Sequence, residues 1–252
     1  MLIENLFFCP VKSISFTEVQ NLKIIENKGI ENDRIFAFVQ NQDQSKIELL
    51  INDPDSRKLN NFVTLKNSPE LNKYNFVFID NKLILRENKR EILSINPYSA
   101  DQQTIISKKI RDLIHKEKKI DFVIDKKNPF FDTMPNNSIS LINKNSINHF
   151  ANKISTNIEF ERFRGNIYLN DLAPWEERGW IGKTIEINNI NFFVTSEIPR
   201  CSATNLKPNT DDQTLNLPNM LKKTYDHINM GVYLIPKNNG TISIENKIKI
   251  NE

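Results

Sequence analysis

The sequence predicts a mainly β protein with a few helices, of the α+β class, built from two β-rich units. Three observations predict this class. Short apolar runs alternate with Asn, Asp, Lys and Gly, as they do in strands joined by turns. One clear helical stripe lies near the middle of the chain. The 252 residues, 38% hydrophobic and 26% charged, are enough to bury the core of one large domain or two modest ones.

The first part of the chain consists mostly of expected strands. The N-terminal apolar residues predict the first strand, and six further β-type runs cover residues 21–27, 34–40, 46–51, 61–65, 74–80 and 82–88. The last two runs meet at Asp80-Asn81, a pair that favours a tight hairpin turn. This part therefore predicts a strand-rich N-terminal unit.

A helix is expected over residues 98–117. Ser99 and Gln102 have the spacing of a capping box, in which each side chain caps the backbone N–H of the other residue. Four apolar residues then form one stripe at helical spacing: Ile106, Ile110, Leu113 and Ile114. The helix marks the boundary between residues 1–97 and residues 118–252, and we expect the two units to pack tightly.

The C-terminal part predicts further strands with two short helices. Strands are expected at residues 120–124, 138–142, 158–169, 231–236 and 240–250, and two more within residues 179–198 that join near Asn188-Asn189. Helices are expected to begin at Asn145 or Ser146 and to cover residues 217–228.

Composition and missing motifs exclude several classes of function. A net charge of +3 is too small to predict nucleic acid or an anionic membrane as the main partner. No run of apolar residues is long enough for a membrane span, and the N-terminus does not resemble a signal peptide, so we expect a cytoplasmic protein. Neither a phosphate-binding glycine loop nor a GxSxG motif is present. The three histidines, His115, His149 and His227, lack metal-ligand spacing and are expected in helical segments as surface or capping residues.

Cys201 is one of only two cysteines, and it follows Pro199 and Arg200. A free cysteine often packs like a small hydrophobic residue, whereas a neighbouring cation favours the reactive thiolate. Both interpretations stay open on the local sequence, as does a disulfide between Cys9 and Cys201. Two cysteines exclude an iron–sulfur cluster bound by four thiolates of the chain.

Basic and amide residues follow or precede several expected strands. They are Lys12, Ser13, Arg34, Arg164 and Asn166. Each alone is more often a surface residue than a ligand contact. Arg164 and Asn166 are two apart, so they would share one face of a strand.

Several motifs together resemble those of MOSC-domain proteins with a MOSC-type N-terminal β-barrel. The motifs occur in the family's order: FFCPVKS, GIENDR, FRGNIYLNDLAPWEERGWIGKTIEI, IPRCSATN and MGVYLI. The group includes the mitochondrial amidoxime-reducing component and the C-terminal part of molybdenum-cofactor sulfurase. The resemblance covers nearly the whole chain and is most specific from Arg164 to Cys201. It implies a β-barrel-like unit, residues 1–97, packed on a MOSC β-barrel, residues 118–252.

The resemblance also implies a cofactor and the residues that bind it. Cys201 would be the protein ligand of molybdenum, because a soft thiolate suits this metal. The phosphate and pterin of molybdopterin would lie against Lys12, Ser13, Arg34, Arg164 and Asn166. Arg200 and Tyr233 would lie near the metal, with Asp132 and Thr133 as further contacts. Cys9 is expected to be a packing residue because relatives commonly carry an aromatic residue there, and Arg57 is a poor candidate for a second basic contact.

The implied activity is that of a molybdenum-dependent oxidoreductase. It would reduce N-hydroxylated or other N-oxygenated small molecules with electrons from a separate ferredoxin- or flavoprotein-type donor. Two alternatives stay open: a sulfur-carrier or cofactor-handling protein with a persulfide on Cys201, and a binding module that stores the cofactor. No nucleic-acid partner and no membrane span are expected.

Overall fold

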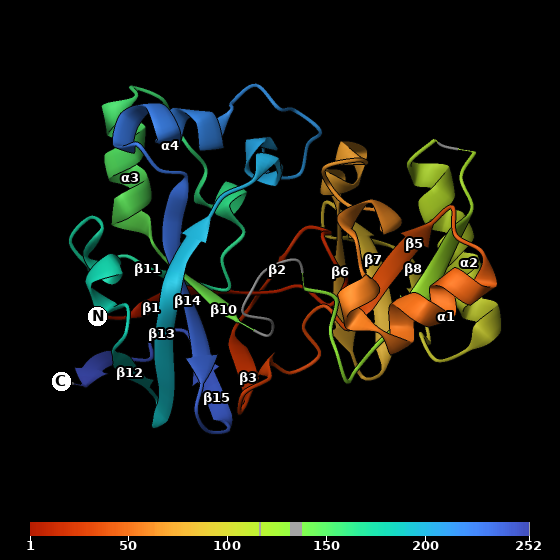
Figure 1. The fold of residues 1–252 in the computed structure, drawn as a ribbon, viewed down its shortest axis with the longest axis horizontal. Coiled ribbons are helices and arrows are strands. Elements are labelled where there is room, and N and C mark those ends of the chain that lie inside the picture. The colour runs from red at the N-terminus through yellow and green to blue at the C-terminus, as the bar shows by residue number, and fades with distance from the viewer. Residues whose placement is uncertain (116, 132–137, 252) are drawn as a thin grey trace.

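The computed structural model describes residues 1–115, 117–131 and 138–251. Figure 1 shows two lobes side by side, one around a long sheet and the other around shorter strands with two helices. We call them the large lobe, which contains β1–β4 and β10–β16 with α3 and α4, and the small lobe, which contains β5–β9 with α1 and α2. The expected class is confirmed, since the protein is mainly β with several sheets.

The main sheet of the large lobe has eight strands. In spatial order they are β16 (Ile248–Asn251), β12 (Thr184–Ile187), β13 (Ile190–Pro199), β14 (Asn229–Pro236), β10 (Ile139–Asn143), β11 (Ile167–Leu169), β1 (Ile3–Phe8) and β2 (Thr17–Val19). Its neighbours are antiparallel except β10 and β11, which are parallel. The first strand therefore lies against a strand about 160 residues later, with Leu6 opposite Ile167.

A smaller sheet brings further N-terminal residues into the large lobe. It consists of β15 (Gly240–Ser243), β3 (Asn21–Ile25) and β4 (Gly29–Ile30). Strands β1 to β4 thus pair with one another and with strands from the second half of the chain. The division into residues 1–97, 98–117 and 118–252 stays a prediction.

Two sheets and two helices form the small lobe. The first sheet pairs β5 (Phe36–Gln40) with β9 (Ile120–Ile124), and the second contains β6 (Tyr74–Ile79), β7 (Lys82–Glu87) and β8 (Arg90–Ile95). The helices are α1 (Gln44–Asn52) and α2 (Ala100–Leu113). Rings of Phe36, Phe38, Phe76 and Phe122 pack against one another in the core. The expected helical stripe is present, because Ile106 and Ile110 of α2 are buried in this core.

The remaining helices are short. In the large lobe α3 (Lys144–Lys153) and α4 (Leu217–Tyr225) lie close together beside one end of the long sheet (Figure 1). The described residues also contain six 3-10 helices: η1 (Pro54–Ser56), η2 (Leu59–Asn61), η3 (Pro69–Lys73), η4 (Phe160–Phe163), η5 (Glu176–Trp180) and η6 (Ser202–Asn205). In the described residues no helix combines the length and apolar character needed to cross a bilayer.

Both expected two-residue turns are present. In the first, Ile79 pairs with Lys82 across Asp80-Asn81, whose φ angles are 49° and 57°. In the second, Ile187 pairs with Ile190 across Asn188-Asn189, with φ angles of 49° and 63°. Positive φ at both central residues matches the twist of antiparallel strands, and Asn and Asp tolerate this conformation well.

Several local expectations were wrong in the small lobe. Residues 46–51 belong to helix α1, because Ile47 and Leu50 are buried three residues apart and Asp43 caps the N–H of Lys46. Residues 61–65 form no strand, only a single bridge between Phe62 and Val39. The capping box at Ser99 is absent, since the Gln102 side chain accepts a hydrogen bond from Asn96 N instead.

The segment at residues 158–169 also differs from the expected single strand. It contains the 3-10 helix η4, then Arg164 with a left-handed φ of 50°, and only then β11. Arg164 and Asn166 therefore do not share a strand face. Residues 240–250 form two strands, β15 and β16, joined by a turn. His227 follows α4 rather than lying in it.

Candidate functional site

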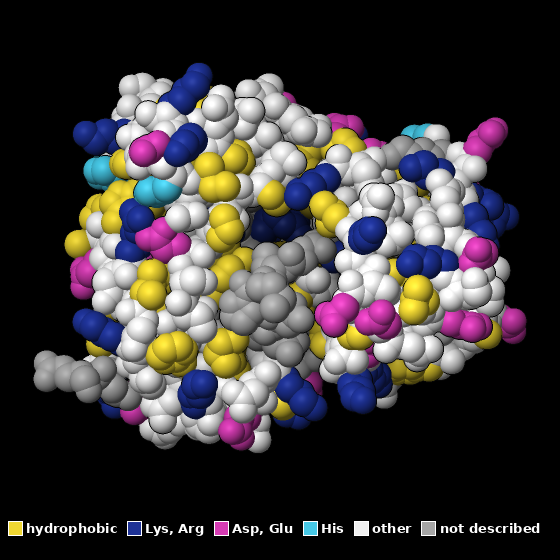
Figure 2. Space-filling view, viewed as in Figure 1, with side chains coloured by type: hydrophobic (Ala, Val, Ile, Leu, Met, Phe, Trp, Pro, Cys, Tyr) yellow, Lys and Arg dark blue, Asp and Glu magenta, His cyan; other side chains and the backbone are white. Residues whose placement is uncertain are grey.

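A cavity of about 560 Å³ lies between the two lobes. One wall comes from the small lobe and from the segment after β1, and the other comes from the large lobe around η4, β13 and β14. Figure 2 shows dark blue side chains of Lys and Arg inside the hollow between the two halves of the molecule. The volume falls within the range of about 300–1,000 Å³ found for small-molecule sites.

The structure brings together every predicted site residue that it describes. The cavity is lined by Lys12, Ser13, Arg34, Arg164, Asn166, Arg200, Cys201 and Tyr233. Asp132 and Thr133 lie outside the described residues. Five lining residues that sequence reasoning missed are Phe16, Lys58, Lys66, Ser138 and Ser140. These five belong to no motif, so no sequence signal identified them.

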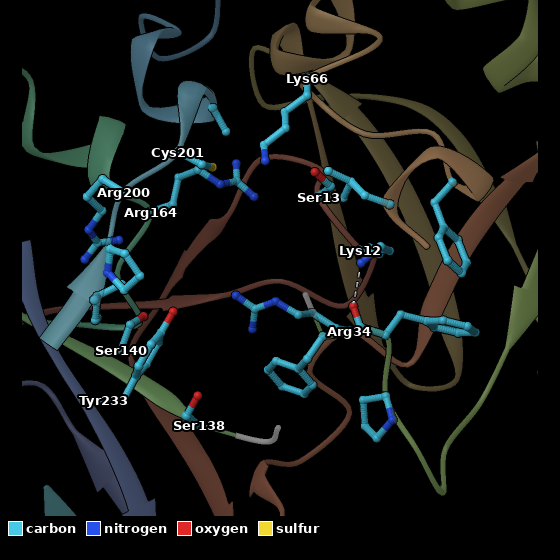
Figure 3. A pocket seen from close by; sticks show the side chains of 18 of the residues that line it. Lys12, Ser13, Arg34, Lys66, Ser138, Ser140, Arg164, Arg200, Cys201 and Tyr233 are labelled. Carbon is cyan, nitrogen blue, oxygen red and sulfur yellow. Dashed lines mark hydrogen bonds between the residues drawn. The ribbon is translucent and has the colours of Figure 1, made fainter. Parts of the chain in front are cut away.

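Cys201 presents an exposed thiol at the edge of this cavity (Figure 3). It follows β13 directly and precedes η6. The Cys201 carbonyl accepts hydrogen bonds from Thr204 N at 3.1 Å and Thr204 Oγ1 at 2.8 Å, which fix its backbone. Cys201 and Cys9 are both free, so no disulfide joins them.

Cys9 is fully buried, in contrast to Cys201. Its Sγ contacts two carbonyl oxygens as a donor, Val11 O at 3.1 Å and Ile14 O at 3.3 Å. Burial raises the pKa of the Cys9 thiol to about 11, although Arg34 and Arg164 oppose this shift. The thiol therefore stays protonated near neutral pH and fastens the loop that carries Lys12 and Ser13.

That loop places a lysine in the cavity wall. Lys12 N donates to Phe36 O at 2.8 Å, and Lys12 Nζ donates to Phe130 O at 3.1 Å. The ammonium group also lies 5.2 Å from the centre of the Phe62 ring. Ser13 adopts a left-handed φ of 62°, and its Oγ accepts a hydrogen bond from Leu65 N. The carbonyl and ring contacts hold the side chain of the buried Lys12 in place.

Two arginines of the cavity contact one aromatic ring. The guanidinium carbon of Arg34 lies 5.0 Å from the centre of the Phe16 ring, and that of Arg164 lies 4.7 Å from it. Arg34 also lies 4.8 Å from the ring of Phe131 and forms an ion pair with Asp33. These cation–π contacts align both guanidinium groups at the cavity.

Burial of Arg164 removes water from its guanidinium group, which raises the free energy of the charged form. Its Nη2 donates to Ile14 O at 2.9 Å, and burial lowers the pKa of the guanidinium from its ordinary value. Arginine stays protonated even so. A bound anion would offset the cost of burying this charge, so Arg164 is suited to hold one.

Asn166 and Arg200 line the cavity, and both also make hydrogen bonds within its wall. Asn166 Oδ1 accepts from Ser140 N at 3.2 Å and Ser140 Oγ at 2.9 Å, and Asn166 Nδ2 donates to Phe7 O. Arg200 Nη1 donates to Phe163 O at 2.8 Å, and Arg200 Nε donates to a second carbonyl, Met230 O, at 2.8 Å. Both side chains therefore fix the backbone of the cavity wall.

Arg57 lines the cavity too, but its guanidinium group already has partners within the protein. It forms an ion pair with Asp125 and donates to the carbonyls of Leu50 and Asn128 at 2.7 Å. It thereby ties α1 to the segment that leads to Phe130.

The cavity is strongly basic. Its described lining contains seven cationic residues and one acidic residue, Asp55; the cationic residues are Lys12, Arg34, Arg57, Lys58, Lys66, Arg164 and Arg200. Since the whole chain carries only +3, the positive charge is concentrated here. Such a site favours an anionic ligand.

The described residues contain no group of three His, Cys, Asp or Glu side chains that could hold a metal ion. Cys201 is the one thiol among the described lining residues of the cavity, and a thiolate suits a soft metal.

Comparison with known proteins gives one family. Residues 130–249 match the family model described as the MOSC domain. The matched segment includes Arg164, Asn166, Arg200, Cys201 and Tyr233. No protein among the curated sequences compared matches this chain.

Two solved structures are similar at low identity. The YuaD protein from Bacillus subtilis is 11% identical, with a TM-score of 0.47, over 99% of this chain and 94% of that chain. YiiM from Geobacillus stearothermophilus is 17% identical, with a TM-score of 0.37, over 45% of this chain and 54% of that chain.

Proposed function

Because residues 130–249 of this chain carry a MOSC domain, a domain associated with the molybdenum cofactor, we propose that the protein is a molybdenum-dependent oxidoreductase. Molybdopterin would occupy the cavity between the lobes. The observation that carries this proposal is the exposed thiol of Cys201 on the wall of a basic cavity. Family membership alone would not assign a function, because function depends on the residues of the site.

The residues present fit this cofactor. Its phosphate is an anion, and Lys12, Arg34 and Arg164 supply charged donors on the walls of the cavity. Phe16 aligns the two arginines, and the Lys12 ammonium is held by Phe130 O. Cys201 supplies a soft ligand for molybdenum. Asp132 and Thr133 remain proposed contacts, as does Ser13.

When bound, the molybdenum cofactor supplies a metal that exchanges two electrons with the substrate. Reduction of an N–OH group to N–H consumes two electrons and two protons and releases one water. The chain must therefore also deliver protons. Tyr233, from β14, lines the cavity, and its hydroxyl lies beside that of Ser140 in Figure 3. We assign proton donation to Tyr233 Oη, because Tyr233 lines the cavity that the substrate would enter.

The substrates we propose are N-hydroxylated or other N-oxygenated small molecules. The electrons would come from a separate protein of the ferredoxin or flavoprotein type. Two cysteines, one of them buried, cannot supply the four thiolates that hold an iron–sulfur cluster, which favours an external donor.

One alternative rests on the same residue. An exposed free thiol next to cationic residues could also carry a persulfide, which would make the protein a sulfur carrier. Quantifying molybdenum and pterin in the purified protein, together with sulfur released by cyanide, separates the two functions. The oxidoreductase proposal expects about one molybdenum per chain and no cyanide-labile sulfur on Cys201. Protein without molybdenum but with labile sulfur would support the carrier instead.

A further inference from the structure

A second cavity, of about 640 Å³, lies next to the first. The two share three lining residues, Phe16, Arg164 and Ala203. Beyond this common wall, the second cavity is lined by β6 and β7 of the small lobe and by η4 of the large lobe. It has its own set of side chains, and neither Cys201 nor Lys12 is among them.

Two lining residues of the second cavity have unsatisfied polar atoms. Asn75 of β6 and Arg86 of β7 are directly opposite each other in the sheet. Asn75 Oδ1 and Arg86 Nε are both buried without a hydrogen-bond partner. Among the described residues, no carboxylate or carbonyl pairs with the Arg86 side chain. Buried polar atoms are rarely left unpaired, so the pair indicates a missing polar partner. An anion would accept from the Arg86 guanidinium, and the Asn75 amide, turned over, would donate Nδ2 to the same anion.

The other charges of the cavity are mixed. Lys73 is already paired with Asp211, with 2.7 Å between Nζ and Oδ2, and Arg162 is paired with Glu159. One exposed cation, Lys89, and two carboxylates, Glu18 and Glu161, also line the cavity. The two carboxylates would repel a doubly charged phosphate more strongly than a single negative charge paired with Arg86.

Aromatic rings form an apolar part of the wall. Phe7 and Phe16 both line the cavity, and the Phe7 ring is fixed by edge-to-face contacts with Phe160 and Tyr168. A flat apolar ligand body can pack on such rings.

The outer rim of the cavity is tied down. Asn72 Nδ2 donates to Lys207 O at 2.8 Å and to Thr210 O at 2.7 Å, so the loop after η6 is fastened to the small lobe. The Lys73–Asp211 ion pair adds a second tie. The cavity is therefore preformed, which lowers the entropic cost of binding a ligand.

We propose that this second cavity binds a small aromatic monocarboxylate, with its carboxylate on Arg86 and its ring against Phe7 and Phe16. The site is independent of the molybdenum chemistry proposed for Cys201. Arg164 lines both cavities, so a ligand in the second one lies next to a residue that holds the cofactor.

The test is a calorimetric titration of the purified protein with benzoate, with and without the molybdenum cofactor. We expect one benzoate per chain in both forms, unchanged by saturating inorganic phosphate. Benzamide, which has the same shape without the charge, should bind at least tenfold more weakly. Replacing Arg86 with glutamine should lower the association constant for benzoate at least tenfold.

The matched control is Arg90→Gln, which removes an arginine from the neighbouring strand β8 whose side chain is 79% exposed. It should change the affinity by less than twofold. Asn75→Asp would place a carboxylate opposite Arg86, so it should raise the melting temperature while abolishing benzoate binding. Absence of benzoate binding to the wild type, or equal binding by the Arg86→Gln variant, would overturn the proposal. Either result leaves the molybdenum assignment untouched, because that is measured by metal content.

Discussion

The guanidinium group of Arg164 lies over the ring of Phe16, with its carbon 4.7 Å from the ring centre. Arg34 lies over the same ring at 5.0 Å, although it comes from a different part of the chain. The aromatic ring attracts both guanidinium groups, which otherwise repel each other. This contact brings two cations from distant segments to one ring at the wall of the cavity.

Replacing Phe16 with leucine should loosen both arginines. A cation–π contact is worth about 0.5–2 kcal/mol, so we expect the affinity for the cofactor to fall about two- to thirtyfold. Phe16→Tyr should keep it, because the ring remains. Phe193, whose ring contacts Lys237 away from the cavity, supplies the control variant Phe193→Leu. The measurement is pterin content per chain, and a normal content in Phe16→Leu would refute this role.

Arg164→Ala should lower cofactor occupancy more strongly. A hydrogen bond between charged groups contributes about 1.5–3 kcal/mol, which corresponds to a loss of roughly tenfold or more in affinity. Lys183→Ala is the control, because Lys183 is exposed and outside both cavities. Pterin and molybdenum are quantified in both purified variants. Equal occupancy in the two would show that Arg164 does not bind the cofactor.

Cys9 should make the folded protein sensitive to alkali. Its pKa is raised from 9.0 to about 11 by burial, so the unfolded thiol loses its proton more easily than the folded one. The resulting stability is fully present below about pH 9 and is lost as the pH rises through 11. Urea unfolding at pH 8 and at pH 10.5 measures it. Because other groups also titrate there, the comparison is with Cys9→Ala, whose loss of stability over this interval should be smaller. An equal loss in both proteins would contradict the assigned pKa.

The parts of the fold carried by local patterns could be predicted from the sequence. The pairs Asp80-Asn81 and Asn188-Asn189 located two hairpin turns, and apolar spacing located α2. Residues 46–51 were misassigned because a short apolar run fits a strand and a helix equally well. In the structure they form a helix whose N-terminus is capped by the side chain of Asp43. The pairing of β1 with β11 depends on contacts about 160 residues apart, which no local pattern encodes.

The site could be predicted only where a motif carried its residues. Cys201, Arg164 and Lys12 lie in motifs, and the structure places all three around one cavity. Phe16 and Lys66 reach the same cavity from segments without a motif, so only the fold identifies them. The sequence also could not reveal that the side chains of Asn166 and Arg200 donate hydrogen bonds to backbone carbonyls. The carbonyls that accept these bonds belong to distant residues, which only folding brings close.

The most direct test of the proposed function compares Cys201→Ser with Cys9→Ser. Both variants are measured for reduction of an N-hydroxylated substrate with reduced viologen as donor, normalised to bound molybdenum. Serine keeps the shape of Cys201 but replaces a soft thiolate with a hard oxygen ligand. We expect Cys201→Ser to stay folded, to retain much of the pterin and to lose activity by orders of magnitude, while Cys9→Ser keeps most of its activity per metal. Full activity of Cys201→Ser per molybdenum would contradict the assignment of Cys201 as the metal ligand.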